Sequence, residues 1–332
     1  MGESSSAVEP PFEATYKNLF RDAQVLNQAV YEVYDVVEER ELPLIDLSEL
    51  NRGEFIREEC KRKMARASRE WGFFQVVNHG VSREILETMR SEQVKLFRKP
   101  FQEKMKDRNL NFSTGSYRWG APSATCLRQL SWSEAFHVPL SDISGGSVSR
   151  PNNLSSTMDE FATSLSDLAQ RLAKILAEKL GHKSTYFEET CLPTTCYVRM
   201  NRYPACRIHD NVFGLTPHTD SDFLTILHQD LIGGLQLVKD GKWISVKPNP
   251  EALAWSNGVY KSVEHRVVAH ETKERFSAAF FLCPSYDTTI QSCSQPSLYR
   301  TFTFGEFRQQ VQEDVKNFGY KVGLPRFLVS TH

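Results

Sequence analysis

The sequence predicts a mainly β fold with added helices, in which a sandwich or jelly roll is flanked by helical segments. Three observations lead to this fold class. Between residues 194 and 284, short segments rich in β-branched and aromatic residues alternate with turn signals, which is typical of antiparallel sandwiches and barrels. Outside this region, apolar residues recur every three or four positions, which indicates amphipathic helices. No GxGxxG or Walker loop follows a strand-like segment, so a nucleotide-binding fold is disfavoured.

The elements before the β region follow one another as helices and single strands. Residues 1–40 mix Ser, Pro and acidic residues with scattered apolar ones, and we expect a loosely ordered leader there. The apolar spacing that follows predicts a strand at 42–47, a helix at 54–71, a strand at 73–77, a helix capped by Ser82, and a helix over 161–176 that ends at Gly181. These long helices are expected to be scaffold.

The second half begins after a stretch of different character. Residues 111–157 are rich in Ser, Gly, Asn and aromatics, which suggests either an irregular excursion that lines a binding site or a plain surface loop. Strands are then expected at 196–203, 224–228, 234–238, 243–246, 259–268 and 276–282, with a tight hairpin turn at Asp240-Gly241. The chain is thus divided into a leader (1–40), an N-terminal helix and strand region (41–190), a jelly-roll core (191–300), and a C-terminal helix and tail (301–332).

Composition excludes several classes of partner. The 332 residues contain 40 Lys and Arg against 41 Asp and Glu, so no basic field is available to hold nucleic acid or anionic lipid. The seven cysteines are odd in number and form no CxxC pair, which fits reduced thiols in the cytosol, with the nucleus also open. No apolar run approaches the roughly 18 residues that a membrane span needs. We therefore expect a cytoplasmic protein, a monomer, that acts on a small molecule.

A candidate metal site is formed by two histidines and one carboxylate. His218-Thr219-Asp220 places an imidazole and a carboxylate two residues apart, so that both can point to one side of an extended segment, and His265 lies in a later strand of the same β region. This ligand set leaves three coordination positions open, which suits non-haem Fe(II) that must bind a bidentate ligand and then O₂. Taken singly, His218 and Asp220 can instead cap turns, and His265 can be an ordinary strand residue. His79 is expected to support a turn.

A candidate carboxylate site follows on a later strand. Alternation turns Arg275 and Ser277 to one face, and because an unpaired buried charge is costly, Arg275 needs a partner. A ligand carboxylate and an internal salt bridge are about equally favoured for that part. Arg binds carboxylates in bidentate fashion and Ser277 adds a hydroxyl donor, which suits the distal carboxylate of 2-oxoglutarate. Asn201 and Tyr203 share a face and can offer an amide and a phenol to the same ligand, unless Tyr203 packs in the core.

Together these motifs resemble the plant 2-oxoglutarate-dependent dioxygenases, over roughly residues 40–330. The matching stretches are Glu70–Gly80 (EWGFFQVVNHG), Asn201–Pro204 (NRYP), Pro217–Asp220 (PHTD), Gly233–Leu237 (GGLQL), Ser256–Arg266 (SNGVYKSVEHR) and Arg275–Ser277 (RFS). The resemblance implies a double-stranded β-helix (jelly-roll) core, Fe(II) on His218, Asp220 and His265, and 2-oxoglutarate on Arg275, Ser277 and Tyr203. It also implies O₂ as the second co-substrate and ascorbate as a supporting reductant.

Within that family, three shorter segments look like the gibberellin 2-oxidases that act on twenty-carbon gibberellins: Gly115–Gly120 (GSYRWG), Ser131–His137 (SWSEAFH) and Val322–Leu328 (VGLPRFL). The resemblance implies hydroxylation, and so inactivation, of a hormone precursor at carbon 2. Such a substrate is a rigid apolar ring system with carboxylates, and Tyr117, Arg118 and Trp119 offer it aromatic walls and a cation. The alternatives are a packed loop with Arg118 paired to a protein acid, and a different substrate such as a flavonoid or a gibberellin biosynthetic intermediate.

One stretch departs from the family pattern. Relatives carry about nine further residues, an apolar strand followed by a Gly-Asp turn, where Leu253 here runs directly into Ala254. We therefore expect the family's core strand before His265 to be missing, with Ala252–Ser256 as a makeshift replacement, and stability and iron binding to suffer. A catalytically inactive chain that only binds a ligand or a partner is a further alternative.

Overall fold

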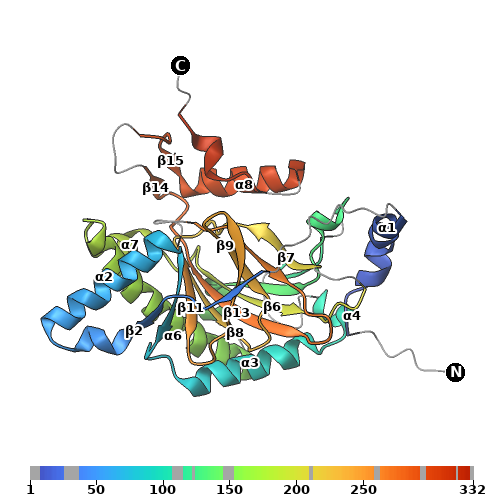
Figure 1. Ribbon diagram of the computed structural model, residues 1–332, viewed down its shortest axis with the longest axis horizontal. Coiled ribbons are helices and arrows are strands. Elements are labelled where there is room, and N and C mark those ends of the chain that lie inside the picture. The colour runs from blue at the N-terminus through green and yellow to red at the C-terminus, as the bar shows by residue number, and fades with distance from the viewer. Residues whose placement is uncertain are drawn as a thin grey trace.

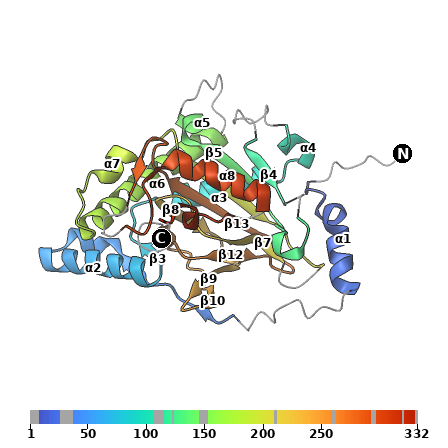
Figure 2. The same cartoon turned by 90° about the horizontal axis from the view of Figure 1, so that it is seen from above.

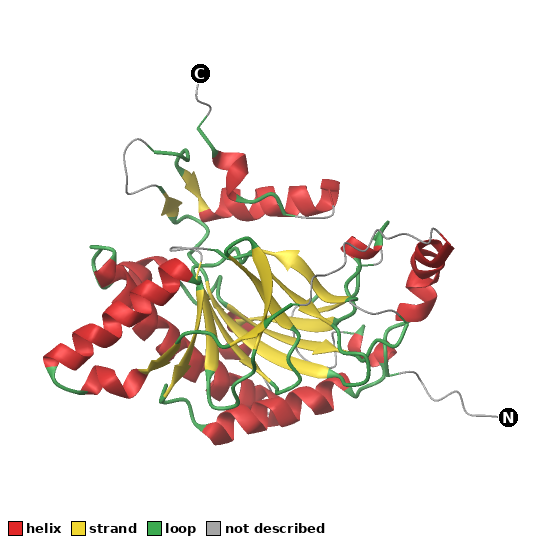
Figure 3. Cartoon of the chain, viewed as in Figure 1, coloured by secondary structure: helices red, strands yellow, loops and turns green. Residues whose placement is uncertain are grey.

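Two β-sheets face each other around a shared interior, and helices pack on the outside (Figures 1 and 3). A computed structural model describes residues 8–25, 37–106, 115–121, 124–144, 153–208, 212–257, 262–291, 297–318 and 321–329. The smaller sheet has the order β1 (Glu39–Arg40), β10 (Lys242–Val246), β9 (Leu235–Lys239), β12 (His265–Val268), β7 (Phe213–His218). The larger sheet has the order β2 (Leu44–Asp46), β3 (Phe73–Val77), β11 (Leu253–Asn257), β8 (Leu224–Gln229), β13 (Arg275–Leu282), β6 (Tyr197–Tyr203), β5 (Glu134–Pro139), β4 (Tyr117–Trp119).

The two sheets form the double-stranded β-helix that the sequence predicted. In the core, strands far apart in the chain pair with each other: β7 pairs with β12, and β8 pairs with β11 and β13, all antiparallel. From β7 to β13 the chain passes back and forth between the two sheets, with the β9–β10 hairpin within the smaller one, and the interior between them is lined from both sides.

Strand β13 shows how side chains that alternate between the two faces of a strand place residues in the site. All eight of its residues are buried. Arg275, Ser277 and Ala279 line the central cavity, whereas Phe276 and Phe280 belong to the main apolar cluster and are not among the residues lining the cavity. One face of this fully buried strand thus lines the cavity, and the other face packs in the apolar core.

Helices cover the outer face of the larger sheet. They are α2 (Glu54–Glu70), α3 (Arg83–Phe97) and α6 (Asn153–Lys179), with the short helices α4 (Phe101–Lys104), α5 (Leu140–Ser144) and α7 (Tyr186–Thr190) beside them. The Ser82 hydroxyl accepts a hydrogen bond from the backbone nitrogen of Glu84 at 3.2 Å, which confirms the predicted cap of α3. The apolar face predicted for α6 is buried, with Leu165 and Leu172 fully inaccessible.

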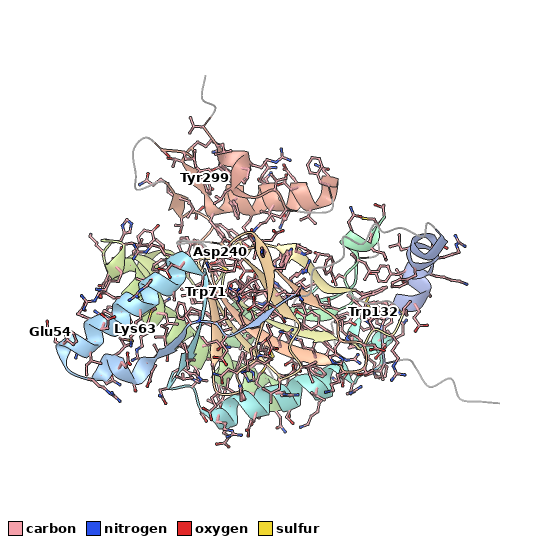
Figure 4. All side chains as sticks on the ribbon, viewed as in Figure 1. Glu54, Lys63, Trp71, Trp132, Asp240 and Tyr299 are labelled. Carbon is pink, nitrogen blue, oxygen red and sulfur yellow. The ribbon has the colours of Figure 1, made fainter. Side chains whose placement is uncertain are left out.

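The expectation of a loosely ordered leader is wrong for residues 8–25. Helix α1 (Phe12–Val25) buries Phe12, Tyr16 and Phe20, and Phe12 stacks on Trp132 with ring centroids 4.7 Å apart. Figure 4 labels Trp132 on the side of the barrel where α1 packs, at the end of the molecule opposite α2 (Figures 1 and 2). Scattered aromatic residues at helical spacing were the available signal. Residues 1–7 and 26–36 lie outside the described residues.

The stretch 111–157 is more regular than expected in its described part. Strands β4 and β5 extend the edge of the larger sheet, with Arg118 opposite Ala135 and His137 opposite Arg199. The predicted turn at Asp240-Gly241 is confirmed, since both residues have positive φ, 52° and 76°, as the tight hairpin between β9 and β10 requires.

The position expected to be empty after Leu253 is filled. Strand β11 lies between β3 and β8 and pairs with both, Leu253 with Val76 and Ala254 with Leu227. Leu253 and Ala254 are buried. The sheet is therefore not left open: the makeshift strand expected at Ala252–Ser256 forms one residue later, at Leu253–Asn257, while 258–261, which lead towards His265, lie outside the described residues.

A C-terminal unit lies over one end of the barrel (Figures 1 and 2). It contains β14 (Thr289–Ile290), β15 (Phe302–Thr303), α8 (Phe304–Phe318) and the described residues 321–329 that follow α8, and Figure 4 labels Tyr299 within it. Helix α8 is the last amphipathic helix that the sequence predicted. Within the described part of the chain, no helix has the length and apolar character that crossing a membrane requires.

We predict that inserting about nine residues of apolar strand and Gly-Asp turn after Leu253 raises stability and turnover. The strand is present, but it buries an alanine at position 254, where a larger aliphatic side chain would contribute about 1.5–3 kcal/mol. Melting temperature and turnover of the two chains are compared, with an insertion of equal length at the exposed Asp240-Gly241 turn as control. Equal values for the native chain and the Leu253 insertion would show that the short strand costs nothing.

Candidate metal and co-substrate site

Two histidines and an aspartate meet where β7 and β12 lie side by side. His218 ends β7, His265 begins β12, and the two are direct partners in the antiparallel ladder, which brings their ring centroids to 4.2 Å. Asp220 follows β7, with its Oδ1 3.9 Å from His218 Nε2 and 3.7 Å from His265 Nε2. One ligand atom from each residue lies within 4.8 Å of the other two. The three predicted ligands thus converge.

Each candidate ligand is oriented by a second group. The Nδ1 atoms of His218 and His265 lie 2.8 Å and 3.1 Å from the carbonyl oxygens of Thr216 and Val263. A proton on Nδ1 donated to these carbonyls leaves both Nε2 lone pairs for a metal. The Thr225 hydroxyl donates to Asp220 Oδ2 at 2.7 Å, which leaves Oδ1 directed at the histidines.

Burial favours the ligand form of His218. Desolvation, and then the neighbouring His265, lower the pKa of His218 to about 3, against an opposing effect of Asp220. The imidazole is therefore neutral near pH 7, as a metal ligand must be.

The site lines a cavity of about 180 Å³ between the two sheets. Besides the three ligands, its walls include Arg275 and Ser277 from β13, and Asn201 and Tyr203 from β6. These residues pair across the ladder, Arg275 with Tyr203 and Ser277 with Asn201. All four side chains predicted to hold a co-substrate therefore face the same cavity as the metal ligands.

Arg275 is a buried cation without a carboxylate partner among the described residues. It is 2% exposed, its Nη2 donates to the neutral Gln229 Oε1 at 2.7 Å, and its Nε and Nη1 have no hydrogen-bond partner. The guanidinium lies 4.9 Å from the Tyr203 ring centroid. The alternative of an internal salt bridge is thus not realised in the described structure. A buried charge left this way is costly unless a ligand anion completes it.

Tyr203 is held in place by a glycine. A Cβ atom on Gly214 would lie 2.5 Å from Tyr203 Cδ1, so only glycine lets β7 approach the ring this closely. The residue that stacks beneath Arg275 is therefore fixed by the neighbouring sheet.

The donor set fits Fe(II) and 2-oxoglutarate. Two imidazole nitrogens and one carboxylate oxygen are the ligands expected for non-haem iron with open positions, and the unpartnered guanidinium nitrogens of Arg275 fit a dicarboxylate's distal end. Ser277 Oγ lies 3.4 Å from Asn201 Nδ2, so its own hydroxyl proton is available to that ligand.

The three residues proposed for substrate do not share one surface. Tyr117 is buried and its hydroxyl donates to Glu134, while Trp119 packs against Phe12 at 5.7 Å between ring centroids. Arg118 lies between them on β4, on the opposite face. The expectation that Tyr117 and Trp119 form the substrate walls is therefore wrong, because strand alternation turns both towards the core.

The sequence analysis missed several residues of the cavity. Arg199 shares the face of Asn201 and Tyr203 on β6 and lines the cavity, and the period of two could have found it. Thr225, which holds Asp220, and Arg308, which reaches the cavity from α8, have no local signal. His79 supports a turn, as predicted, since its Nδ1 accepts from the backbone nitrogen of Val81 at 3.1 Å.

Comparison with known proteins places these features in a family. Residues 194–284 match the family model described as 2OG-Fe(II) oxygenase superfamily, and residues 42–155 match that described as non-haem dioxygenase in morphine synthesis N-terminal. Gibberellin 2-beta-dioxygenase 8 of Arabidopsis thaliana is 57% identical over 338 residues, which cover 97% of this chain and 99% of that protein. Gibberellin 2-beta-dioxygenase 6 of Oryza sativa subsp. japonica is 50% identical, over 97% of this chain and 96% of that protein.

More distant relatives are named for other substrates. Flavanone 3-dioxygenase 2 of Oryza sativa subsp. japonica is 31% identical over 82% of this chain and 84% of that protein. The crystal structure of JOX2 in complex with 2OG, Fe and JA superimposes with a TM-score of 0.71 at 27% identity, covering 98% of this chain and 100% of that one. The first alignment, over 338 residues, is longer than the 332 residues of this chain, so that relative carries residues that this chain lacks.

We predict that Asp220→Ala abolishes metal-dependent turnover, because it removes one of three ligands. Fe(II) binding under anaerobic conditions and succinate formation are measured, with Asp240→Asn at an exposed turn as the control. Iron-dependent succinate formation that persists in Asp220→Ala would contradict the ligand assignment.

We predict that Arg275→Ala raises the 2-oxoglutarate requirement by an amount equivalent to about 2–5 kcal/mol, the range for truncating one partner of a buried charge pair. The dissociation constant of 2-oxoglutarate is measured by titration of the Fe(II)-loaded protein. Arg300→Ala, an exposed arginine of the C-terminal unit, is the control. A dissociation constant equal to that of the native chain would mean that Arg275 does not bind the co-substrate.

Proposed function

This chain belongs to the 2OG-Fe(II) oxygenase superfamily, and from this premise we propose that it hydroxylates gibberellin precursors of the twenty-carbon class at carbon 2 and so inactivates them. The observation that carries the proposal is the near full-length match to proteins named gibberellin 2-beta-dioxygenases, at 57% and 50% identity. The identity to a flavanone dioxygenase is lower, at 31%, and this difference favours a gibberellin substrate over a flavonoid. A monomeric state and a cytoplasmic location belong to the same proposal.

The chemistry divides between the bound groups and the protein. When bound, Fe(II) and 2-oxoglutarate supply an oxidation by O₂ in which one oxygen atom enters succinate, with release of CO₂, and the other enters the substrate as hydroxyl. The residues of this chain orient the two reactants and exclude water from the cavity. The apolar residues of the wall meet this second requirement, among them Phe73, Leu215, Leu227 and Leu235.

Three arginines from distant parts of the chain supply a cationic region beside the cavity. Arg199 on β6 and Arg308 on α8 line the cavity, and Arg118 on β4 is separated from β6 only by β5. Burial, and then the charges of Arg199 and Arg308, lower the pKa of Arg118. Arg118 and Arg308 make no hydrogen bond or ion pair in the part of the chain that the structure describes. We propose that this arginine cluster (Arg118, Arg199 and Arg308) binds a carboxylate of the substrate.

Electrostatics favour an anionic substrate over a neutral one here. The same burial and the same three arginines lower the pKa of His137 to about 3, so this histidine is neutral near pH 7. Asp222 also lines the cavity, but it already accepts from Cys283 Sγ at 3.0 Å and Tyr197 hydroxyl at 3.3 Å. Like charges held together at a partly desolvated surface attract an anion of matching shape.

The proposed function is tested by product analysis. Purified chain is incubated with Fe(II), 2-oxoglutarate, ascorbate and a panel of twenty-carbon and nineteen-carbon gibberellins and flavanones, and succinate and hydroxylated products are identified. The proposal requires a 2-hydroxylated twenty-carbon gibberellin. Hydroxylation of a flavanone, or succinate formation with no gibberellin product, would replace it with one of the alternatives.

We predict that Arg118→Ala and Arg308→Ala raise the KM for a gibberellin carboxylic acid at least about tenfold, the loss of one charge-assisted contact, and leave the 2-oxoglutarate KM unchanged. The methyl ester of the same gibberellin should bind the native chain weakly, and each variant should distinguish acid from ester less than the native chain does. Arg83→Ala, an exposed arginine of α3, is the control. Equal losses for both ligands, or for neither, would remove the arginine cluster from substrate binding.

A further inference from the structure

Lys321 reaches from the C-terminal unit to the loop that carries the metal ligands. Its Nζ donates to the carbonyl oxygens of Thr219 and Asp220 at 2.7 Å and 3.1 Å, and to the hydroxyl of Ser221 at 3.0 Å. A lysine ammonium has three N–H donors, and here all three end on consecutive residues of one loop. The contact joins residues about 100 positions apart in the chain.

The position of Lys321 is set by a buried carboxylate in α8. Asp314 is fully buried and accepts hydrogen bonds from the backbone nitrogen of Val322 at 3.1 Å and from Arg326 Nε at 3.0 Å. The nitrogen that it holds belongs to the residue next to Lys321. The Phe307 ring lies below the ammonium, with 5.8 Å from Nζ to the ring centroid. Lys321 is therefore held in place by residues of the C-terminal unit as well as by the loop.

Side chains from other parts of the barrel also hold this loop at Asp220. The loop leaves β7 after His218. It directs the side chain of Asp220 towards the two histidines, while the backbone carbonyl of Asp220 points away from them. On the inner side Thr225 holds the carboxylate at 2.7 Å, and on the outer side Ser262 donates to the Asp220 carbonyl at 3.3 Å. Lys321 supplies the charged donor for that carbonyl and for the preceding one, and charge-assisted bonds are about twice as strong as neutral ones.

We infer that Lys321 is a positioning residue for Asp220, and that the C-terminal unit is through it a part of the metal site. The inference rests on the assignment of His218, Asp220 and His265 as metal ligands, and not on the identity of the substrate. Metal ligands must be placed within about 0.2 Å, and groups that orient ligands from outside commonly affect metal affinity 10–100-fold.

The contact also has a reverse consequence. If docking of the C-terminal unit favours metal binding, metal binding favours docking of the unit to the same extent, because the two equilibria are linked. Arg308 in α8 then reaches its place beside the cavity only in the docked state. Loading the metal thereby helps to complete the proposed substrate surface.

The test compares Lys321→Met with the native chain, with Lys321→Arg as the conservative variant and Lys316→Met, an exposed lysine of α8, as the matched control. Mn(II) affinity is measured by titration in the absence of any gibberellin, together with the melting temperature of the metal-free chain and the rate of proteolysis of the C-terminal unit with and without Mn(II). We expect Lys321→Met to weaken Mn(II) binding about 10–100-fold and to abolish the protection that Mn(II) gives to the C-terminal unit. Lys321→Arg should recover part of both, and Lys316→Met should match the native chain.

A second variant tests the same coupling from the other side. Asp314→Asn weakens the hold on Val322 and Arg326 without touching the loop, and it should lower Mn(II) affinity in the same direction by less. The inference would be overturned if Lys321→Met bound Mn(II) as tightly as the native chain does. It would also be overturned if Lys316→Met lost as much Mn(II) affinity as Lys321→Met. If Lys321→Met does not fold, Lys321→Gln is measured against the same criteria. A Mn(II) affinity that depends on Lys321, in a chain that yields no hydroxylated gibberellin, would refute the proposed function and leave this inference standing.

Discussion

The antiparallel pairing of His218 with His265 is the constraint on which the site depends. The two histidines lie on different strands, and only the ladder between β7 and β12 brings their rings to 4.2 Å. Asp220 takes its place because the chain leaves β7 immediately after His218, with Thr225 holding one of its oxygens. A register shift of one residue would turn His265 away from His218, because successive side chains of a strand point to opposite faces. The metal centre is thus a property of strand register.

The same alternation distributes charge between the inside and the outside of the barrel. On β6, Arg199 lines the cavity, whereas Arg202 points to the other side and meets Glu134 at 2.7 Å and Glu274 at 2.9 Å. Both are arginines on one strand, yet Arg202 is paired with carboxylates of the protein, whereas Arg199 faces the cavity. Arg275 on β13 resembles Arg199: it faces the cavity, and its protein partner is the neutral amide of Gln229. Cations without carboxylate partners therefore collect on the cavity side, where they suit the 2-oxoglutarate and carboxylate substrates of this chain's proposed reaction.

The edges of the barrel are closed by segments that come from both ends of the chain. Helix α1 covers Trp132, and Glu9 just before it pairs with the buried Arg202 at 2.8 Å. The C-terminal unit covers the other side and sends Lys321 to the ligand loop. Between them, Leu253–Asn257 completes the larger sheet in spite of the short connection to His265. Backbone pairing on both sides accounts for this, because any extended segment can satisfy the neighbouring N–H and C=O groups.

The sequence by itself determined the fold class and predicted the candidate metal ligands and the Arg275 and Ser277 pair. The fold class, the pair His218 and Asp220, and the pair Arg275 and Ser277 rest on local spacing, two residues apart on a strand or three to four apart on a helix, whereas His265 was added from a later strand of the same β region. The substrate residues and the leader could not be read in this way. Tyr117 and Trp119 are polar-edged aromatics that look like pocket residues, and only the pairing of β4 with β5 decides that they face the core. Arg308 and Lys321 lie near the end of the chain and have no local pattern at all. Their roles arise from contacts between residues about 100 positions apart or more, and such contacts exist only once the barrel has closed and the C-terminal unit has docked on it.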